Sequence, residues 1–290
     1  KVPSKRHIQY YKDSGLLYWE ELISREGFSG IYSNVYHLSP PTALEEIGKS
    51  KKINLKPSNQ IHRHRHMLTS ELNSEGDAVT SRKPLLYNKD IIISKAHFNK
   101  SMKHYLFKNG YYDEVVFIHS GNGLFKSNFG EIAISGGDYL VIPKGIIWRI
   151  DVKEEMRALA IESSAPIETP NRYRNKFGQL LEQAPFSERD IITPSIKEPL
   201  EEKSVTVKLR TASRIQTYIY QYHPFDIIGW DGFYFPYKFN INDFMPITGK
   251  VHQPPTVHQT FKSKNFVICS FVPRLFDYHP DAIPAPYAHS

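Results

Sequence analysis

The chain has 290 residues, of which 40% are hydrophobic and 23% charged, and its formal net charge is +7. These values are typical of a globular protein with one large or two ordinary domains. No apolar run approaches the roughly 18 to 20 residues of a membrane helix, no signal-peptide pattern opens the chain, and no nucleic-acid-binding motif accompanies the basic residues. Cys269 stands alone, which excludes an intrachain disulfide. We therefore expect a cytoplasmic protein with no membrane or nucleic-acid partner.

The first third of the chain offers a short helical segment and a histidine repeat. The stretch from Tyr18 to Ile23 predicts a short helix. His62, His64 and His66 alternate along the chain, and alternate residues of a strand share one face, so a metal site is one interpretation. The interleaved arginines 63 and 65 oppose cation binding, and no carboxylate is close in sequence. We therefore predict a solvated or interfacial basic strand in place of a metal site.

The middle of the chain is dominated by short apolar runs. Val115 to Ile118 and Tyr139 to Ile142 predict buried strands, and Gly and Pro residues recur at short intervals between such runs. This rhythm indicates a β-barrel or β-sandwich.

Two glycine-containing patterns in this region resemble the paired motifs of cupins. The first is Glu114 followed after six residues by Gly121, and the second is the series Gly137, Pro143 and Gly145. The metal-binding histidines of these motifs are replaced, because the expected positions hold Phe107, Lys108, Asn109, Gly110 and Trp148. An indole nitrogen donates hydrogen bonds and does not coordinate metals. The resemblance therefore predicts a degenerate, metal-free cupin over residues 85–160, with an unrelated β-sandwich as the alternative.

Residues 163–204 differ from their surroundings in being rich in Pro, Glu and Lys. They hold the best helical signal of the chain, over Asn175 to Gln183. Beyond them, Val205, Val207 and Leu209 alternate with polar residues, as in a half-exposed strand. We therefore predict an N-terminal β domain (1–162), a connecting segment (163–204) and the first part of a second, catalytic cupin (205–290).

The most specific motif of the chain lies at its C-terminal side. It reads Tyr222-His-Pro-Phe-Asp-Ile-Ile-Gly-Trp230-Asp-Gly-Phe-Tyr234-Phe-Pro-Tyr237-Lys238-Phe-Asn240. It closely resembles the Pro-Phe-Asp…Trp-x-Gly-x-Tyr-x-Pro-Tyr-Lys signature of the homogentisate 1,2-dioxygenase family, and more loosely the likeness runs from Glu20 to the end, closest to shorter prokaryotic members. The resemblance implies an all-β bicupin, or paired double-stranded β-helix, with a degenerate N-terminal cupin.

The resemblance also implies a set of site residues. Family members hold Fe(II) with two His and one Glu, which leaves open positions for O2 and substrate. His289 matches the first histidine ligand, and the other two ligands are expected beyond Ser290, because the chain resembles a truncated family member. His252 matches the acid–base histidine of the pocket, and Tyr287 a substrate-binding residue. His258 is the next candidate for the acid–base group.

The function implied by the resemblance is ring cleavage of homogentisate by O2 to maleylacetoacetate, in tyrosine and phenylalanine catabolism. The partners would be a small aromatic acid and O2, in a homo-oligomer that is a trimer or hexamer. Two alternatives stay open: a non-catalytic bicupin with a binding or structural role, and a related dioxygenase acting on another hydroquinone acid. The Glu and His expected beyond Ser290 would separate the enzyme from the binding protein.

Overall fold

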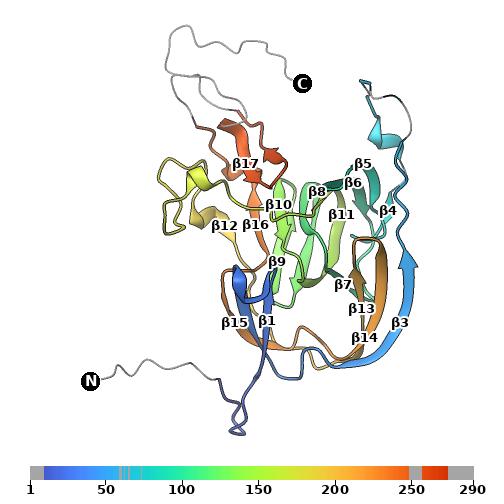
Figure 1. Cartoon of the computed structure of the whole chain (residues 1–290), viewed down its shortest axis with the longest axis vertical. Coiled ribbons are helices and arrows are strands. Elements are labelled where there is room, and N and C mark those ends of the chain that lie inside the picture. The colour runs from blue at the N-terminus through green and yellow to red at the C-terminus, as the bar shows by residue number, and fades with distance from the viewer. Residues whose placement is uncertain are drawn as a thin grey trace.

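The computed structural model describes residues 10–58, 61, 63–64, 66–72, 74–247 and 257–273. Within these ranges the chain forms strands and short 3-10 helices, arranged in sheets of 13, three and two strands (Figure 1). No helix in the described part is long and apolar enough to cross a membrane. The fold is the all-β cupin that the sequence predicts.

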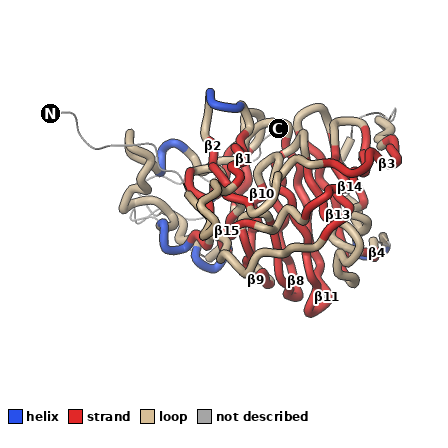
Figure 2. Tube along the Cα trace, turned by 90° about the horizontal axis from the view of Figure 1, so that it is seen from below, coloured by secondary structure: helices blue, strands red, loops and turns tan. Residues whose placement is uncertain are grey.

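Two long strands form the centre of the large sheet. β8 (Asp113–Ser127) and β11 (Ile147–Ser163) pair antiparallel along most of their length, with register shifts between Val152 and Ala158. Figure 2 shows β9, β8 and β11 side by side, with the short helices at the periphery. The neighbours of the central pair are β6 (Ile91–Phe98), β7 (Leu106–Asn109), β9 (Gly130–Ser135) and β10 (Asp138–Ile142).

Burial along β6 and β9 follows the period of two that a barrel wall requires, whereas all five residues of β10 are buried. β6 alternates strictly between half-buried and buried residues. The buried side chains of β6, β7, β8, β10 and β11 form the interior core, which includes Phe98, Phe107, Phe125, Leu140 and Trp148. The runs predicted at Val115–Ile118 and Tyr139–Ile142 lie within β8 and β10, as expected.

Strands from the second half of the chain join the same sheet at both sides. β13 (Lys203–Arg210) runs parallel to β7, and is followed outward by β14 (Arg214–Tyr222) and β3 (Leu44–Lys52). On the other side, β16 (Tyr237–Asn240) pairs with β10 and β12 (Ile191–Ile192) pairs with β16. The predicted domain boundaries stay a prediction, although strands from 205–290 extend the first barrel's sheet.

The three-stranded sheet brings the beginning of the chain against the signature motif. It consists of β1 (Trp19–Ser24), β2 (Tyr32–His37) and β15 (Ile227–Gly232), with β2 in the middle. The short helix predicted over Tyr18–Ile23 is wrong. This segment is a strand because all six residues of β1 find antiparallel partners on β2 and Ile23 enters the core.

The remaining elements are short. They are β4 (Glu75–Gly76) and β5 (Lys83–Tyr87) on β6, the hairpin of β17 (Gln259–Lys262) and β18 (Val267–Cys269), and five 3-10 helices: η1 (Gly27–Ser29), η2 (Thr69–Glu71), η3 (Asn171–Tyr173), η4 (Glu188–Asp190) and η5 (Ile241–Asp243).

The helix predicted over Asn175–Gln183 does not form. The Asn175 side chain accepts hydrogen bonds from the backbone N–H groups of Phe177 (2.9 Å) and Gln179 (3.1 Å), which closes a turn. Asn side chains commonly replace a helix with such a local turn.

Candidate functional site

The interior of the barrel is filled by aromatic side chains at the cupin motif positions. Trp148, in place of the second motif's histidine, lies on β11 with an exposed fraction of 0%. Its indole packs edge to face against Phe107 of β7, with ring centroids 5.4 Å apart. Gly137 and Gly145 keep positive φ angles of 90° and 94°, which glycine adopts without strain. The turns of the motif therefore persist while its ligand positions serve packing.

A buried network of charged side chains lies at one end of this interior. Arg82 Nη1 donates to Glu114 Oε1 over 2.6 Å. Asn109 Nδ2 lies 3.1 Å from Glu114 Oε1 and 3.1 Å from Glu162 Oε1, so the amide joins the two carboxylates. Arg210 Nε lies 2.7 Å from Glu162 Oε1. Two guanidinium groups thus neutralise two carboxylates that are almost entirely withdrawn from water.

The electrostatics of this network depend on its pairing. Burial raises the pKa of Glu162 above its ordinary value, and Arg82 and Arg210 oppose that rise. Burial acts to lower the pKa of Arg82, but Glu114 and Glu162 outweigh it, so the guanidinium stays charged. Carboxylates buried in this way are tolerated only when they are paired and hydrogen-bonded.

The residues present in this barrel do not fit a divalent cation. Glu114, the carboxylate of the first cupin motif, is engaged by the Arg82 guanidinium. The neighbouring positions hold Lys108 and Asn109, of which the first is itself a cation. In the part of the chain that the structure describes, no group of three His, Cys, Asp or Glu side chains is arranged to hold a metal.

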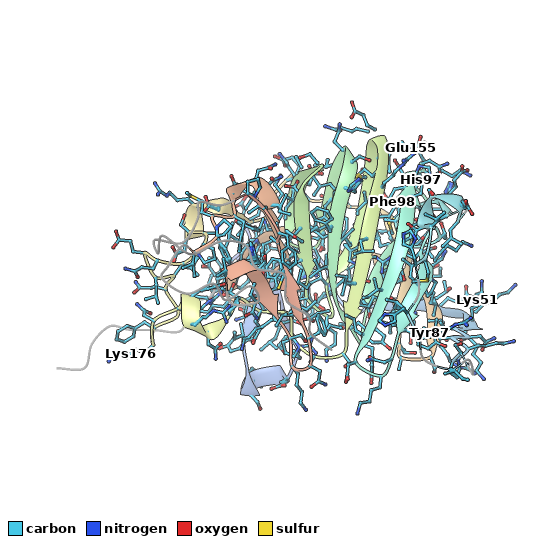
Figure 3. The ribbon with its side chains drawn as sticks, turned by 90° about the horizontal axis from the view of Figure 1, so that it is seen from above. Lys51, Tyr87, His97, Phe98, Glu155 and Lys176 are labelled. Atoms are coloured by element: carbon cyan, nitrogen blue, oxygen red, sulfur yellow. The ribbon has the colours of Figure 1, made fainter. Side chains whose placement is uncertain are left out.

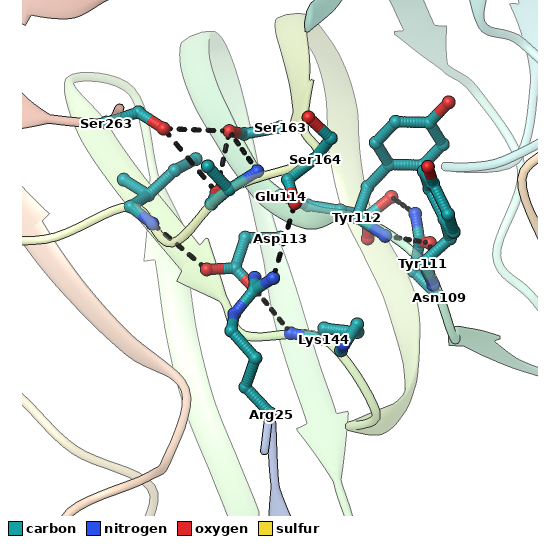
Figure 4. Close-up of polar contacts among 12 residues, drawn as sticks. Arg25, Asn109, Tyr111, Tyr112, Asp113, Glu114, Lys144, Ser163, Ser164 and Ser263 are labelled. Atoms are coloured by element: carbon teal, nitrogen blue, oxygen red, sulfur yellow. Dashed lines mark hydrogen bonds and ion pairs between the residues drawn. The ribbon is translucent and has the colours of Figure 1, made fainter. Parts of the chain in front are cut away.

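Asp113, next to Glu114, joins three segments of the chain. Its carboxylate accepts hydrogen bonds from the Arg25 side chain and from the backbone N–H groups of Lys144 (2.8 Å) and Ile167 (3.0 Å), as Figure 4 shows for Arg25 and Lys144. Burial raises the pKa of Asp113, against the opposing effect of Arg25. Asp113 therefore ties the N-terminal sheet, the β10–β11 turn and the connecting segment together.

The signature segment 222–240 is anchored to the barrel through its polar atoms. Trp230 Nε1 donates to the Phe129 carbonyl (3.1 Å), and the Tyr234 hydroxyl donates to the Lys144 carbonyl (2.7 Å). Lys238 Nζ lies 3.0 Å from Asp138 Oδ2. These residues of the most specific motif attach the segment to the barrel, and Tyr234 is buried while Tyr237 is half-buried.

Asp226, the aspartate in the Pro-Phe-Asp part of the signature, contacts a buried histidine of β2. His37 has an exposed fraction of 0%, and its Nδ1 lies 2.5 Å from Asp226 Oδ1 while its Nε2 lies 3.2 Å from Glu21 Oε2. Burial acts to lower the pKa of His37, but the contacts with Asp226 and Glu21 outweigh it and raise the pKa to about 9. At neutral pH the His37 imidazolium of β2 therefore links Glu21 on β1 with Asp226, which directly precedes β15.

Between the predicted positions His252 and Tyr287 in the sequence, the described residues His258, Thr260 and Ser270 form a buried polar cluster at the hairpin of β17 and β18. His258 Nδ1 lies 3.1 Å from the Ser270 carbonyl. The Ser270 hydroxyl contacts the hydroxyls of Tyr139 (2.9 Å) and Thr260. Because Tyr139 belongs to β10, this cluster fixes the C-terminal hairpin on the barrel. The role of His258 as the next acid–base candidate stays a prediction.

The predicted site residues His252, Tyr287 and His289 lie outside the described residues, so their roles stay predictions. The histidine repeat is described only in part: Arg63, His64 and His66 are exposed and outside any strand. The strand predicted there is not formed by these three described residues.

Sequence reasoning missed the charged residues that the fold brings together. Arg82, Glu162 and Arg210 come from three separate places in the chain. The one available signal is that Glu162 ends an apolar run on β11, where a carboxylate requires a partner. His37 gives a similar signal at the end of β2.

Comparisons with known proteins agree with the signature. The homogentisate 1,2-dioxygenase N-terminal family model matches residues 71–241. A protein of Saccharolobus solfataricus named "Putative dioxygenase" is 39% identical over 291 aligned positions, covering 100% of this chain and 75% of the relative. Human homogentisate 1,2-dioxygenase is 26% identical over 58% of this chain and 38% of its own length. The matched part is thus well under half of the human enzyme.

Solved structures similar to this chain are cupins. A cupin protein from Bacteroides fragilis is 20% identical with a TM-score of 0.30, covering 36% of this chain and 87% of that one. A cupin superfamily protein from Desulfitobacterium hafniense is 17% identical with a TM-score of 0.30, covering 38% and 98%. From the match over residues 71–241 and the 39% identical relative, the chain belongs to the homogentisate 1,2-dioxygenase N-terminal family of dioxygenase-like proteins.

Proposed function

We propose that the chain is part of a ring-cleaving, non-haem Fe(II) dioxygenase that converts homogentisate and O2 to maleylacetoacetate, in tyrosine and phenylalanine catabolism. The observation that carries the proposal is the family match over residues 71–241, which contains the whole signature segment 222–240. The 39% identical relative, matched over the full length of this chain, supports the same class of reaction. We further propose that the protein works in the cytoplasm as a homo-oligomer.

The proposal assigns different tasks to the two halves of the chain. The first barrel is a scaffold, because its motif positions are occupied by Trp148, Asn109 and the Arg82–Glu114 pair. The catalytic residues would come from the second unit, with His289 as an iron ligand, His252 as the acid–base group and Tyr287 in contact with substrate. An imidazole titrates near neutral pH, which suits His252 to accept a phenolic proton.

The alternative from another class is a non-catalytic bicupin with a binding or structural role. The observation that favours it is the salt-bridged network at the motif positions of the first barrel, where Arg82 engages Glu114 and Arg210 engages Glu162, because such an interior suits a structural cupin. A related dioxygenase acting on another hydroquinone acid is a second alternative, because substrate choice depends on pocket residues outside the described part.

The test is metal analysis and O2 uptake on the full natural protein. We expect one iron per subunit after reconstitution with Fe(II) under anaerobic conditions, and O2 consumption with homogentisate that exceeds consumption with gentisate, which lacks one methylene between ring and carboxylate. Consumption with gentisate alone would assign the enzyme to the other hydroquinone acid. A protein that binds no iron and consumes no O2 with either acid would establish the non-catalytic bicupin.

A further inference from the structure

A groove of about 920 Å³ lies on the outer face of β6, β8 and β11, between these strands and the segment from Thr69 to Glu75. This face is opposite to the aromatic interior, because the alternation of β6 places Ala96 inward and Lys95 and His97 outward. Figure 3 shows His97 and Glu155 near the same end of this face.

The floor of the groove is apolar. Phe117, Leu159 and Leu85 line it and are each half-buried. Leu159 on β11 is the direct cross-strand partner of Phe117 on β8 and of Lys95 on β6, so Phe117 and Leu159 lie side by side. A concave surface with an apolar floor and a few polar groups is the usual form of a small-molecule site.

The polar groups differ in whether they already have partners. Lys95 Nζ donates to the carbonyls of Leu72 (2.9 Å) and Thr69, and His97 is ion-paired with Glu155. Arg157 is the cross-strand partner of His97. Among the described residues, no carboxylate lies within ion-pair distance of Arg157, and no hydrogen bond is formed by its guanidinium.

Charge is divided across the groove. Arg157 and His119 line the side formed by the sheet, while Glu71 and Glu75 line the side formed by the segment 69–75. Lys95 on β6 and Arg157 on β11 are diagonal neighbours on this face. Like charges on neighbouring strands are unfavourable, so an anion at Arg157 would stabilise this face. The two glutamates disfavour a dianion such as phosphate and leave room for a single negative charge.

We propose that this groove binds a small organic carboxylate with an apolar body. The carboxylate would contact the Arg157 guanidinium, whose planar fork matches a carboxylate in bidentate fashion, with His119 beside it. The apolar body would lie on Leu159 and Phe117. This binding site is independent of iron and of the dioxygenase reaction, so the proposed function and this proposal can fail separately.

The test is calorimetric titration of the purified, iron-free chain with 3-phenylpropionate, 3-phenylpropionamide, 3-phenylpropylamine and acetate. We expect 3-phenylpropionate to bind at least about tenfold more tightly than the amide and the amine, which share its apolar body. The factor of ten corresponds to about 1.4 kcal/mol. Acetate should bind at least tenfold more weakly, because it cannot use the apolar floor.

Two variants locate the site. Arg157→Gln should weaken 3-phenylpropionate binding about tenfold and leave the amide unchanged, whereas Arg149→Gln is the matched control, because Arg149 is on the same strand but lies beside Asp151 at 3.6 Å. Arg157 is exposed and Arg149 is half-buried, so the fold should persist in both variants. Equal binding of acid and amide, or equal losses in the two variants, would overturn the proposal.

Discussion

The charged network of the first barrel makes a quantitative prediction about stability. Replacing Arg82 by Met removes the guanidinium that lies 2.6 Å from Glu114 and 4.0 Å from Glu162. The two carboxylates then face each other through Asn109 with only Arg210 to balance them. Breaking a buried ion pair by removing one partner costs about 3–5 kcal/mol, so we expect a loss of that size in the free energy of unfolding.

The same structure predicts that a second substitution will recover part of the loss. Glu114→Gln alone leaves Arg82 with only the more distant Glu162, and should cost about 2 kcal/mol. In the double variant Arg82→Met, Glu114→Gln, one cation and one anion are removed together, while the Glu162–Arg210 pair at 2.7 Å remains. The double variant should therefore lose less unfolding free energy than the two single variants lose in sum. The difference, which is the coupling energy, should be about 2 kcal/mol.

The assay is urea unfolding of the four proteins at pH 7, followed by tryptophan fluorescence. Lys153→Met serves as the control, because Lys153 is exposed on β11 and its loss should change stability by no more than about 0.5 kcal/mol. The reasoning is refuted if Arg82→Met costs as little as Lys153→Met, or if the two single changes add without coupling. Either result would mean that water already screens these charges.

Three further predictions concern other parts of the chain. Because the folded-state pKa of His37 is raised from 6.5 to about 9, its stabilising effect, on the order of 3 kcal/mol, should be complete below pH 6.5 and lost as pH rises through 9. Urea unfolding at several pH values checks this, and the slope should vanish in His37→Gln. Tyr234→Phe removes the hydrogen bond to the Lys144 carbonyl and should lower the free energy of unfolding by about 1 kcal/mol; a loss below 0.3 kcal/mol in chemical denaturation would contradict it. In the full natural protein, His252→Ala should reduce kcat about 10²-fold or more with iron retained, while His289→Ala should lose iron; metal analysis beside O2 uptake distinguishes them, and iron loss in both would place His252 among the ligands.

The barrel could be predicted from sequence because its determinants are local. The short apolar runs become β8 and β10 because a continuous apolar run of a few residues between turns favours a buried strand. The turns at Gly137 and Gly145 require positive φ angles that only glycine adopts readily. The position of Trp148 in the interior follows from the same spacing, which the sequence shows directly.

Tertiary contacts decided the elements that sequence reasoning missed. The segment at Tyr18–Ile23 has a helix-like composition, but β2 supplies a full set of backbone partners and makes it a strand. The pairing of His37 with Asp226 joins residues 189 positions apart, and no local pattern encodes such a distance. For the catalytic half, the sequence offers family likeness alone, because the predicted residues His252, Tyr287 and His289 lie outside the described part.

The described contacts of the most specific motif attach the segment 222–240 to β2 and to the first barrel. Within the segment 222–240, Asp226 binds the imidazolium of β2, and three further polar side chains bind the barrel at Phe129, Lys144 and Asp138. Each of these contacts fixes the position of the segment 222–240 on the first barrel. A metal centre requires its ligands to be held within a fraction of an ångström, and a scaffold without its own metal can supply that rigidity through such contacts. Under the proposed function, the signature serves catalysis indirectly, by setting the position from which the proposed second unit begins.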